Sequence, residues 1–160
     1  MLLNMNILTR MCAIVALVMG TTMPVAQAEG TQQPAVSNAK WKDECGACHV
    51  AYPPHMLHAE SWRAIMAGLD KHFGSNAGLD AATAGEITAF LENNARSKGR
   101  APSGKPLLRI TETPWFKSEH REVAARDWKN SKVKSPANCG ACHTQADRGD
   151  FSEDNVKIPK

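Results

Sequence analysis

Cys45-Gly46-Ala47-Cys48-His49 is the stretch that decides the fold, because the same five residues return as Cys139-Gly140-Ala141-Cys142-His143. The residues that flank the two pentapeptides differ. The pattern therefore indicates two units with the same chemistry rather than a duplicated domain sequence.

The spacing within each pentapeptide suits one cofactor. Two thiols at this spacing reach two vinyl groups on one edge of a porphyrin, and the imidazole of the next residue reaches the iron. Glycine and alanine between the cysteines let the backbone lie close to the ring. We therefore predict two covalently attached haem c groups, with the haems bound by Cys45, Cys48, Cys139 and Cys142 and with His49 and His143 as proximal iron ligands.

Other uses of paired cysteines fit the sequence less well. A four-cysteine zinc site needs no histidine after each pair and usually has its pairs closer together in the sequence. A thioredoxin-like redox pair needs one such motif within a βαβ pattern, which is missing here. Structural disulfides are not suggested by so tight a spacing.

The first 28 residues have the composition of a cleaved export signal. Residues 1–10 contain one cation, Arg10, and residues 11–19 are apolar without interruption, which is the order of a signal peptide. Ala26-Gln27-Ala28 then supplies the small-x-small pattern that a signal peptidase recognises. The apolar run is far shorter than the roughly 20 residues that span a bilayer. We therefore predict a signal peptide at residues 1–28 and a protein exported to the periplasm.

The charge of the processed chain argues against a nucleic-acid partner. Arg10 is the only charged residue among the first 28, so the 19 basic and 16 acidic residues of the full chain become 18 and 16. The propionate groups of two haems would shift this near-neutral balance towards negative. A nucleic-acid-binding protein would have a clear basic excess instead.

The pattern of apolar residues predicts an all-α fold. A short helix is expected to end in the first pentapeptide, a helix over residues 61–72 begins at Ser61, and another starts at Asp80. Thr113-Pro114 is a cap followed by proline and predicts a helix to about Trp128. Ser135-Pro136 repeats this start signal before the second pentapeptide. Alternation typical of a strand is nowhere longer than a few residues.

A polar, cationic segment rich in glycine and proline divides the processed chain. It covers residues 96–106 and predicts a linker. We place an N-terminal haem domain at residues 29–98 and a C-terminal haem domain at residues 99–160.

Each iron needs a second axial ligand. His72 lies 23 residues after His49, and His120 lies 23 residues before His143; both fall on apolar faces of predicted helices. The other candidates are His55, Met56, His58 and Met66. His55 and Met56 follow the first pentapeptide too closely for the chain to round the porphyrin edge. His72 and His120 are therefore the favoured distal ligands, and His58 is the main rival.

Motifs between the pentapeptides resemble those of the small periplasmic dihaem cytochromes c of proteobacteria. They include Tyr52-Pro53-Pro54, His72-Phe73-Gly74, residues 110–116 and Glu119-His120. The resemblance covers nearly all of the processed chain. At position 58, where it predicts proline, this chain has His58.

This resemblance implies a fold, a ligand set and partners. It implies an N-terminal domain like a class I cytochrome c, a small and less regular C-terminal haem domain, and bis-histidine ligation that includes His72 and His120. It also implies electron exchange with other periplasmic redox proteins, in some members an oxygen-binding monohaem cytochrome and in some a membrane b-type cytochrome.

Three functional hypotheses follow. The first is an electron carrier with both irons six-coordinate and no enzymatic activity, because a saturated iron cannot bind a substrate. The alternative is a small haem enzyme or gas sensor with one open coordination site. A structural or metal-storage module is the third, and it requires that haem never attaches.

Overall fold

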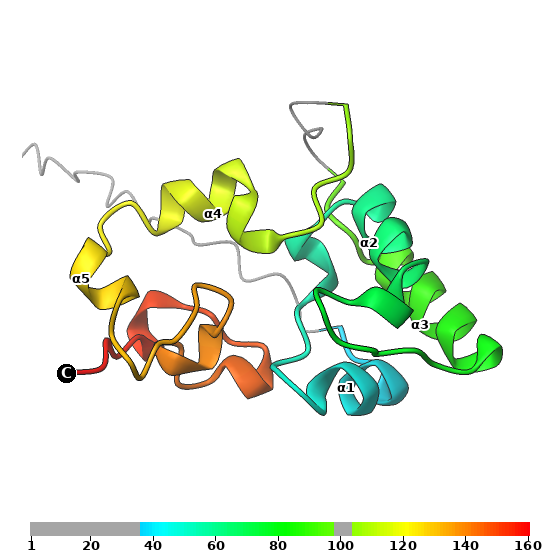
Figure 1. Ribbon diagram of the computed structural model, residues 1–160, viewed down its shortest axis with the longest axis horizontal. Coiled ribbons are helices and arrows are strands. Elements are labelled where there is room, and N and C mark those ends of the chain that lie inside the picture. Colours follow the sequence, from blue (N-terminus) through cyan, green and yellow to red (C-terminus); the bar gives the residue numbers. More distant parts are fainter. Residues whose placement is uncertain (1–35, 98–103) are drawn as a thin grey trace, which may run out of the picture. The chain divides into compact units, whose positions relative to one another are not determined.

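The computed structural model of the protein describes residues 36–97 and 104–160, and its regular structure there is helical (Figure 1). The α-helices are α1 (Ala39–Gly46), α2 (Ala59–Met66), α3 (Ala81–Asn93), α4 (Pro114–Glu119) and α5 (Ala125–Trp128). Short 3₁₀ helices lie at Pro54–Met56, Leu69–Lys71, Ile110–Glu112, Cys139–Ala141, Ala146–Arg148 and Glu153–Asn155. The described ranges contain no strand, only isolated bridges at His72 and His143. The prediction of an all-α fold is confirmed.

Two predictions fall on other parts of the chain. The signal peptide at residues 1–28 and the domain boundary between residues 98 and 99 lie outside the described residues, and both stay predictions. Within the two described ranges, no helix is both long and apolar enough to cross a membrane.

The main core lies among α1, α2 and α3. Its buried side chains are Trp41, Leu57, Trp62, Ile87 and Leu91. Helices α2 and α3 pack against each other (Figure 1). Each fully buried aliphatic or aromatic side chain of this size stabilises the fold by about 1.5–3 kcal/mol. The buried side chains of this core all come from the first half of the structure, and Ile110 from the second half packs against it.

Two of the predicted helix starts are confirmed. The Asp80 carboxylate accepts hydrogen bonds from the backbone N–H groups of Ala82 and Thr83 at 3.0 Å each, so it caps α3. The Thr113 hydroxyl accepts one from Phe116 N–H at 3.2 Å and caps α4. Both caps satisfy amide groups that have no partner within the helix.

The predicted helix over residues 61–72 is wrong at both ends. Helix α2 begins after His58, so Ser61 lies buried within it rather than at its cap. The helix ends before Gly68, a residue that is costly in a helix interior. His72 therefore follows a separate 3₁₀ turn and has non-helical backbone angles.

The single helix predicted from Pro114 to Trp128 is also wrong. Helix α4 stops at Glu119, and α5 is a separate short helix. The Phe116 carbonyl accepts the His120 backbone N–H at 3.0 Å and also bonds the His120 imidazole Nδ1 at 2.9 Å. A side chain that bonds the backbone in this way competes with helix propagation, and the helix ends at that residue.

The backbone of the two pentapeptides differs. Cys45 and Gly46 close α1, and the rest of the first pentapeptide is a turn. At the second, the Ser135 hydroxyl accepts a hydrogen bond from Ala137 N–H at 3.2 Å, but only a 3₁₀ turn follows. The expected helix start at Ser135 is therefore wrong, because the chain forms only one 3₁₀ turn there and does not continue as an α-helix.

Candidate haem sites

The first site is built at the end of α1. Cys45 is half-buried against the core, while Cys48 is exposed. The His49 ring follows at once, and its Nδ1 bonds the Val50 carbonyl at 2.7 Å. An imidazole that donates Nδ1–H to a carbonyl keeps the lone pair of Nε2 free for a metal.

His72 lies opposite His49. The centres of the two rings are 6.2 Å apart, and their planes differ by 27°. Two imidazoles bound to one metal ion from opposite sides, with bonds of about 2.0 Å, would have ring centres roughly 6 Å apart. The separation therefore fits one iron between the two rings.

Left-handed backbone follows His72 directly. Phe73 has φ of 48° and Gly74 has φ of 98°, a conformation that is a genuine outlier for a bulky residue. The Phe73 ring meets the His72 ring edge-on at 4.9 Å, and the Arg109 guanidinium lies 4.1 Å from the Phe73 ring centre. Burial lowers the pKa of His72, and the nearby charges of His49 and Arg109 lower it further. The neutral imidazole, which is the form that binds a metal, is therefore favoured.

The second site is held by the C-terminal tail. The Cys142 carbonyl accepts a hydrogen bond from Lys157 N–H at 2.8 Å, and Asn155 accepts one from Thr144 N–H at 3.0 Å. These bonds flank His143 and attach the end of the second pentapeptide to the tail around Val156. At this site, backbone hydrogen bonds to the tail hold the pentapeptide in place, whereas the first pentapeptide is held by helix packing.

His120 lies next to His143. Their ring centres are 6.1 Å apart, and their planes differ by 70°. The His120 ring stacks on Phe116 at 4.0 Å, and its Nδ1 is bonded to the Phe116 carbonyl. The separation again fits one iron, with Nε2 of His120 free.

The His143 ring lies in a different environment from the His49 ring. Its Nδ1 is buried and has no hydrogen-bond partner among the described residues. Burial and then His120 lower the pKa of His143, while Asp150 acts in the opposite direction. The neutral imidazole, the form that binds a metal, is therefore favoured.

One thiol of each pentapeptide is buried in a way that disfavours its thiolate form. All four described cysteines are free. Burial raises the pKa of Cys45 and of Cys139 to about 11 in each case. Reactive pairs have low pKa values because the thiolate is the nucleophile, so the pKa values count against a thioredoxin-like pair.

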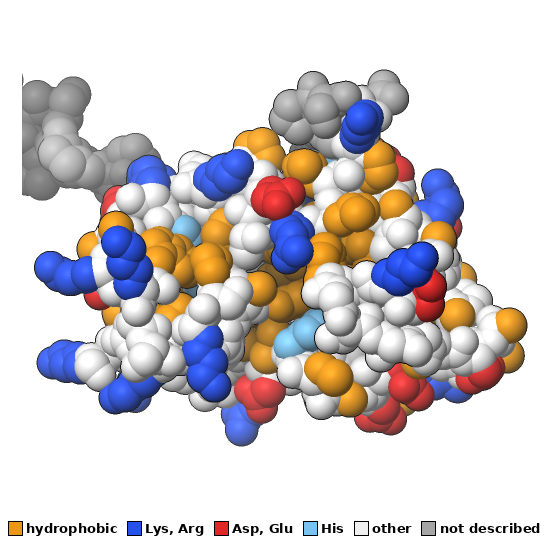
Figure 2. Space-filling view, viewed as in Figure 1, with side chains coloured by type: hydrophobic (Ala, Val, Ile, Leu, Met, Phe, Trp, Pro, Cys, Tyr) orange, Lys and Arg blue, Asp and Glu red, His pale blue; other side chains and the backbone are white. Residues whose placement is uncertain are grey.

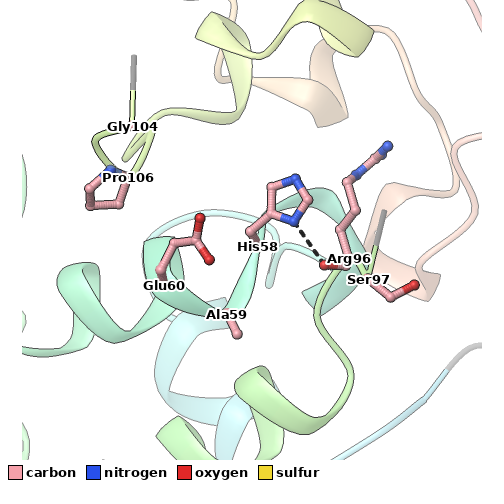
Figure 3. Close-up of a pocket in the computed structure, with 7 residues that line it drawn as sticks. All are labelled: His58, Ala59, Glu60, Arg96, Ser97, Gly104 and Pro106. Carbon is pink, nitrogen blue, oxygen red and sulfur yellow. Dashed lines mark hydrogen bonds between the residues drawn. The ribbon is translucent and has the colours of Figure 1, made fainter. Parts of the chain in front are cut away.

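The other histidines lie elsewhere. His58 Nδ1 bonds the Arg96 carbonyl at 2.9 Å, and the ring lines a cavity of about 530 Å³ together with Glu60 (Figure 3). His55 is partly buried, and the pKa of its ring is lowered by burial and by Arg96. Among the described residues, neither imidazole is paired with an aromatic or histidine ring, whereas His49 and His143 each have two such neighbours.

The residues present fit two haem groups. Each pentapeptide has two free thiols and a histidine, and each histidine lies near a second imidazole at a distance that accommodates one iron. Figure 2 shows histidine side chains in hollows lined by apolar side chains. An apolar porphyrin bound through thiols and imidazoles matches this donor set.

Sequence reasoning missed three contacts at these sites. The Tyr52 ring stacks on His49 with centres 4.6 Å apart, Trp128 lies 5.8 Å from His120, and Phe151 lies 5.5 Å from His143. Tyr52 follows the first pentapeptide by three residues, a spacing that could have indicated the stack. Trp128 ends the separate helix α5, which was not predicted, and Phe151 follows the turn at Gly149 in the C-terminal tail.

The chain matches known proteins of one kind. The model of the dihaem cytochrome c family matches residues 41–151. The crystal structure of DHC purified from Rhodobacter sphaeroides is 48% identical and has a TM-score of 0.64, with 72% of this chain and 98% of that chain covered. The diheme cytochrome type c from Shewanella baltica OS155 is 41% identical with a TM-score of 0.67, and the match covers 76% and 93% of the two chains.

A comparison with curated proteins gives no match. The family match spans both pentapeptides and both histidine pairs, and the matched structures are covered almost completely. The chain therefore belongs to the dihaem cytochrome c family and is a c-type cytochrome with two covalently bound haem c groups.

Proposed function

We propose that this protein is a periplasmic electron carrier in which His49 and His72 bind one iron and His143 and His120 bind the other. The two ring separations, 6.2 Å and 6.1 Å, carry the proposal. When bound, haem supplies an iron that takes up and releases one electron without a change of ligands.

The residues of the chain would hold the two groups in complementary ways. Cys45 with Cys48, and Cys139 with Cys142, would form the thioether links. The carbonyls of Val50 and Phe116 fix the imidazoles of His49 and His120 through Nδ1. Rings held in this way need little reorganisation when the charge on the iron changes, which favours fast electron transfer.

Two ligands at each iron would leave no site for a substrate or a gas. The chain would then act by exchanging electrons with other redox proteins of the periplasm and not as an enzyme. An oxygen-binding monohaem cytochrome and a membrane b-type cytochrome are the partner classes that the family resemblance suggests. The export signal read from residues 1–28 supports the periplasmic location.

Carbon monoxide binding to the reduced holoprotein tests the ligand assignment. We expect the wild-type protein to bind no CO, and His72→Ala and His120→Ala each to open one iron and bind one CO per molecule. His58→Ala is the matched control, because it removes a partly buried histidine that lines a separate cavity, and it should bind none. CO binding by His58→Ala but not by His72→Ala would overturn the assignment, and CO binding by the wild-type protein would favour a sensor or enzyme with an open iron.

A further inference from the structure

Tyr52 contacts both haem sites. Its ring stacks on His49 with a centre separation of 4.6 Å and an angle of 17° between the planes. Its hydroxyl donates a hydrogen bond to the Ala137 carbonyl at 2.6 Å. One side chain therefore joins the proximal imidazole of the first site to the backbone that enters the second pentapeptide.

The Ala137 carbonyl belongs to the immediate surroundings of the second site. Cys139 Sγ lies 3.6 Å from the same oxygen, and Cys139 is one of the cysteines that would bind the second haem. The oxygen thus contacts both the Tyr52 hydroxyl and the Cys139 sulfur, which would form a thioether with the second haem. A path from the His49 imidazole to Cys139 therefore runs through the Tyr52 ring, its hydrogen bond to the Ala137 carbonyl, and the 3.6 Å contact of that oxygen with Cys139 Sγ.

A second contact supports the same junction. A Cβ atom built on Gly140 would lie 3.8 Å from Val50 Cγ1, which is ordinary van der Waals distance. Val50, which directly follows the first pentapeptide, therefore lies close to Gly140 of the second pentapeptide. Close packing of this kind fixes the distance between the two sites.

We propose that Tyr52 is a positioning residue that sets the plane of the His49 imidazole and provides the route by which an electron crosses between the two haems. With haems held by the two pentapeptides, one electron would pass from the reduced iron to the oxidised one, and no proton or bond would change place. The proposal rests on the proposed function, because it assumes that both irons exchange electrons.

Two variants separate the roles of the ring and the hydroxyl. Tyr52→Phe keeps the stack on His49 and removes the hydrogen bond to Ala137, while Tyr52→Leu removes both. Phe151→Leu is the control, because Phe151 contacts His143 at 5.5 Å and comes from the C-terminal tail. The variants are made as holoproteins, and absent CO binding checks that both irons keep their two ligands.

Pulse radiolysis of the oxidised holoproteins delivers one electron per molecule, and time-resolved absorbance follows its redistribution between the haems. We expect slower redistribution in Tyr52→Phe and Tyr52→Leu, by a similar factor, and the wild-type rate in Phe151→Leu. A wild-type rate in Tyr52→Phe would overturn the route. Equal slowing in Phe151→Leu would also overturn the route through Tyr52, because the loss of any aromatic ring beside a haem ligand would then explain the slower transfer.

Electron paramagnetic resonance (EPR) of the oxidised proteins tests the positioning role separately. The signal of the first site is identified as the one lost in His72→Ala. We expect this signal to be unchanged in Tyr52→Phe and shifted in Tyr52→Leu, because only the second variant removes the ring that stacks on the His49 imidazole and leaves the Val50 carbonyl as its one remaining contact of the two. An unshifted signal in Tyr52→Leu would overturn the positioning role. Either result leaves the CO test of the proposed function unaffected, so the two proposals can fail independently.

Discussion

The two haem sites belong to regions that are built differently. Residues 36–97 have six buried apolar side chains, and five of them form one core among α1, α2 and α3. Residues 104–160 have only Phe116, Val133 and Ala146 as buried apolar side chains, and turns and tail hydrogen bonds hold them. A region with so few buried side chains gains most of its core from the porphyrin, so its fold should depend more strongly on haem attachment.

Removing one haem at a time tests this contrast most severely. In Cys139→Ala/Cys142→Ala we expect loss of one haem and loss of structure over residues 104–160, because little apolar packing remains there. In Cys45→Ala/Cys48→Ala, α1, α2 and α3 should keep part of their helical structure. Limited proteolysis with mass spectrometry locates the cleavage sites, and the mass of each protein gives its haem content. If both regions lost protection from proteolysis equally, whichever haem is missing, the two regions would not differ in their dependence on haem.

A core substitution in each region sharpens the comparison. Ile87 is fully buried in α3, so Ile87→Ala should lower the free energy of unfolding by about 2–5 kcal/mol through lost burial and a cavity. Val133→Ala removes less buried surface and should cost about 1.5 kcal/mol at roughly 0.8 kcal/mol for each carbon removed. Denaturant unfolding of the two variant holoproteins and the wild type measures both changes in the free energy of unfolding. A larger cost at Val133 would show that the second region has the tighter core.

The tail that encloses the second site offers a smaller effect. The Asn155 side-chain amide donates a hydrogen bond to the Asp150 carboxylate at 2.7 Å. The backbone carbonyl of Asn155 accepts a hydrogen bond from the Thr144 N–H. Asn155→Ala should lower the free energy of unfolding by about 1–2 kcal/mol through the lost side-chain hydrogen bond to a charged group. Hydrogen exchange should show faster opening around His143 and unchanged exchange in α3. Faster exchange in α3 as well would show that the two regions open together.

The smallest effect concerns pH and the first region alone. Hydrogen bonds from Thr83 and Ala82, with help from Lys40, lower the pKa of Asp80. A carboxylate with a lowered folded pKa stabilises the fold above its unfolded pKa of about 3.9, and this stabilisation is lost as the pH falls through the folded value. Asp80→Asn keeps a capping side chain without the charge, so it should unfold with less acid sensitivity than the wild type. Unfolding midpoints at neutral and acidic pH measure this, and identical acid sensitivity of the two proteins would contradict it.

Local features of the sequence predicted one helix start in each region. The helix starts at Asp80 and Thr113 follow from caps that act within three residues. The spatial pairing of His49 with His72 and of His143 with His120 agrees with the equal sequence distances. Their role as iron ligands stays a proposal.

Side-chain and tertiary contacts account for what the sequence did not predict. The break after α4 depends on one imidazole that bonds Phe116, a contact that apolar periodicity does not encode. The bond from Tyr52 to Ala137 joins residues that are 85 positions apart. The turns of the second region depend on the tail packing back onto Cys142. Such contacts arise from tertiary packing, which overrides local propensity.

The angles between the imidazole planes give the sharpest spectroscopic difference between the sites, 27° at the first and 70° at the second. Near-parallel planes give a rhombic low-spin ferric signal, whereas near-perpendicular planes give one with a larger highest g value. EPR of the fully oxidised wild-type holoprotein therefore tests the central claim directly. Bis-histidine ligation at both irons predicts two low-spin signals of these two kinds in equal amounts and no high-spin signal. A high-spin signal from half of the iron would contradict it, because one iron would then lack its second histidine.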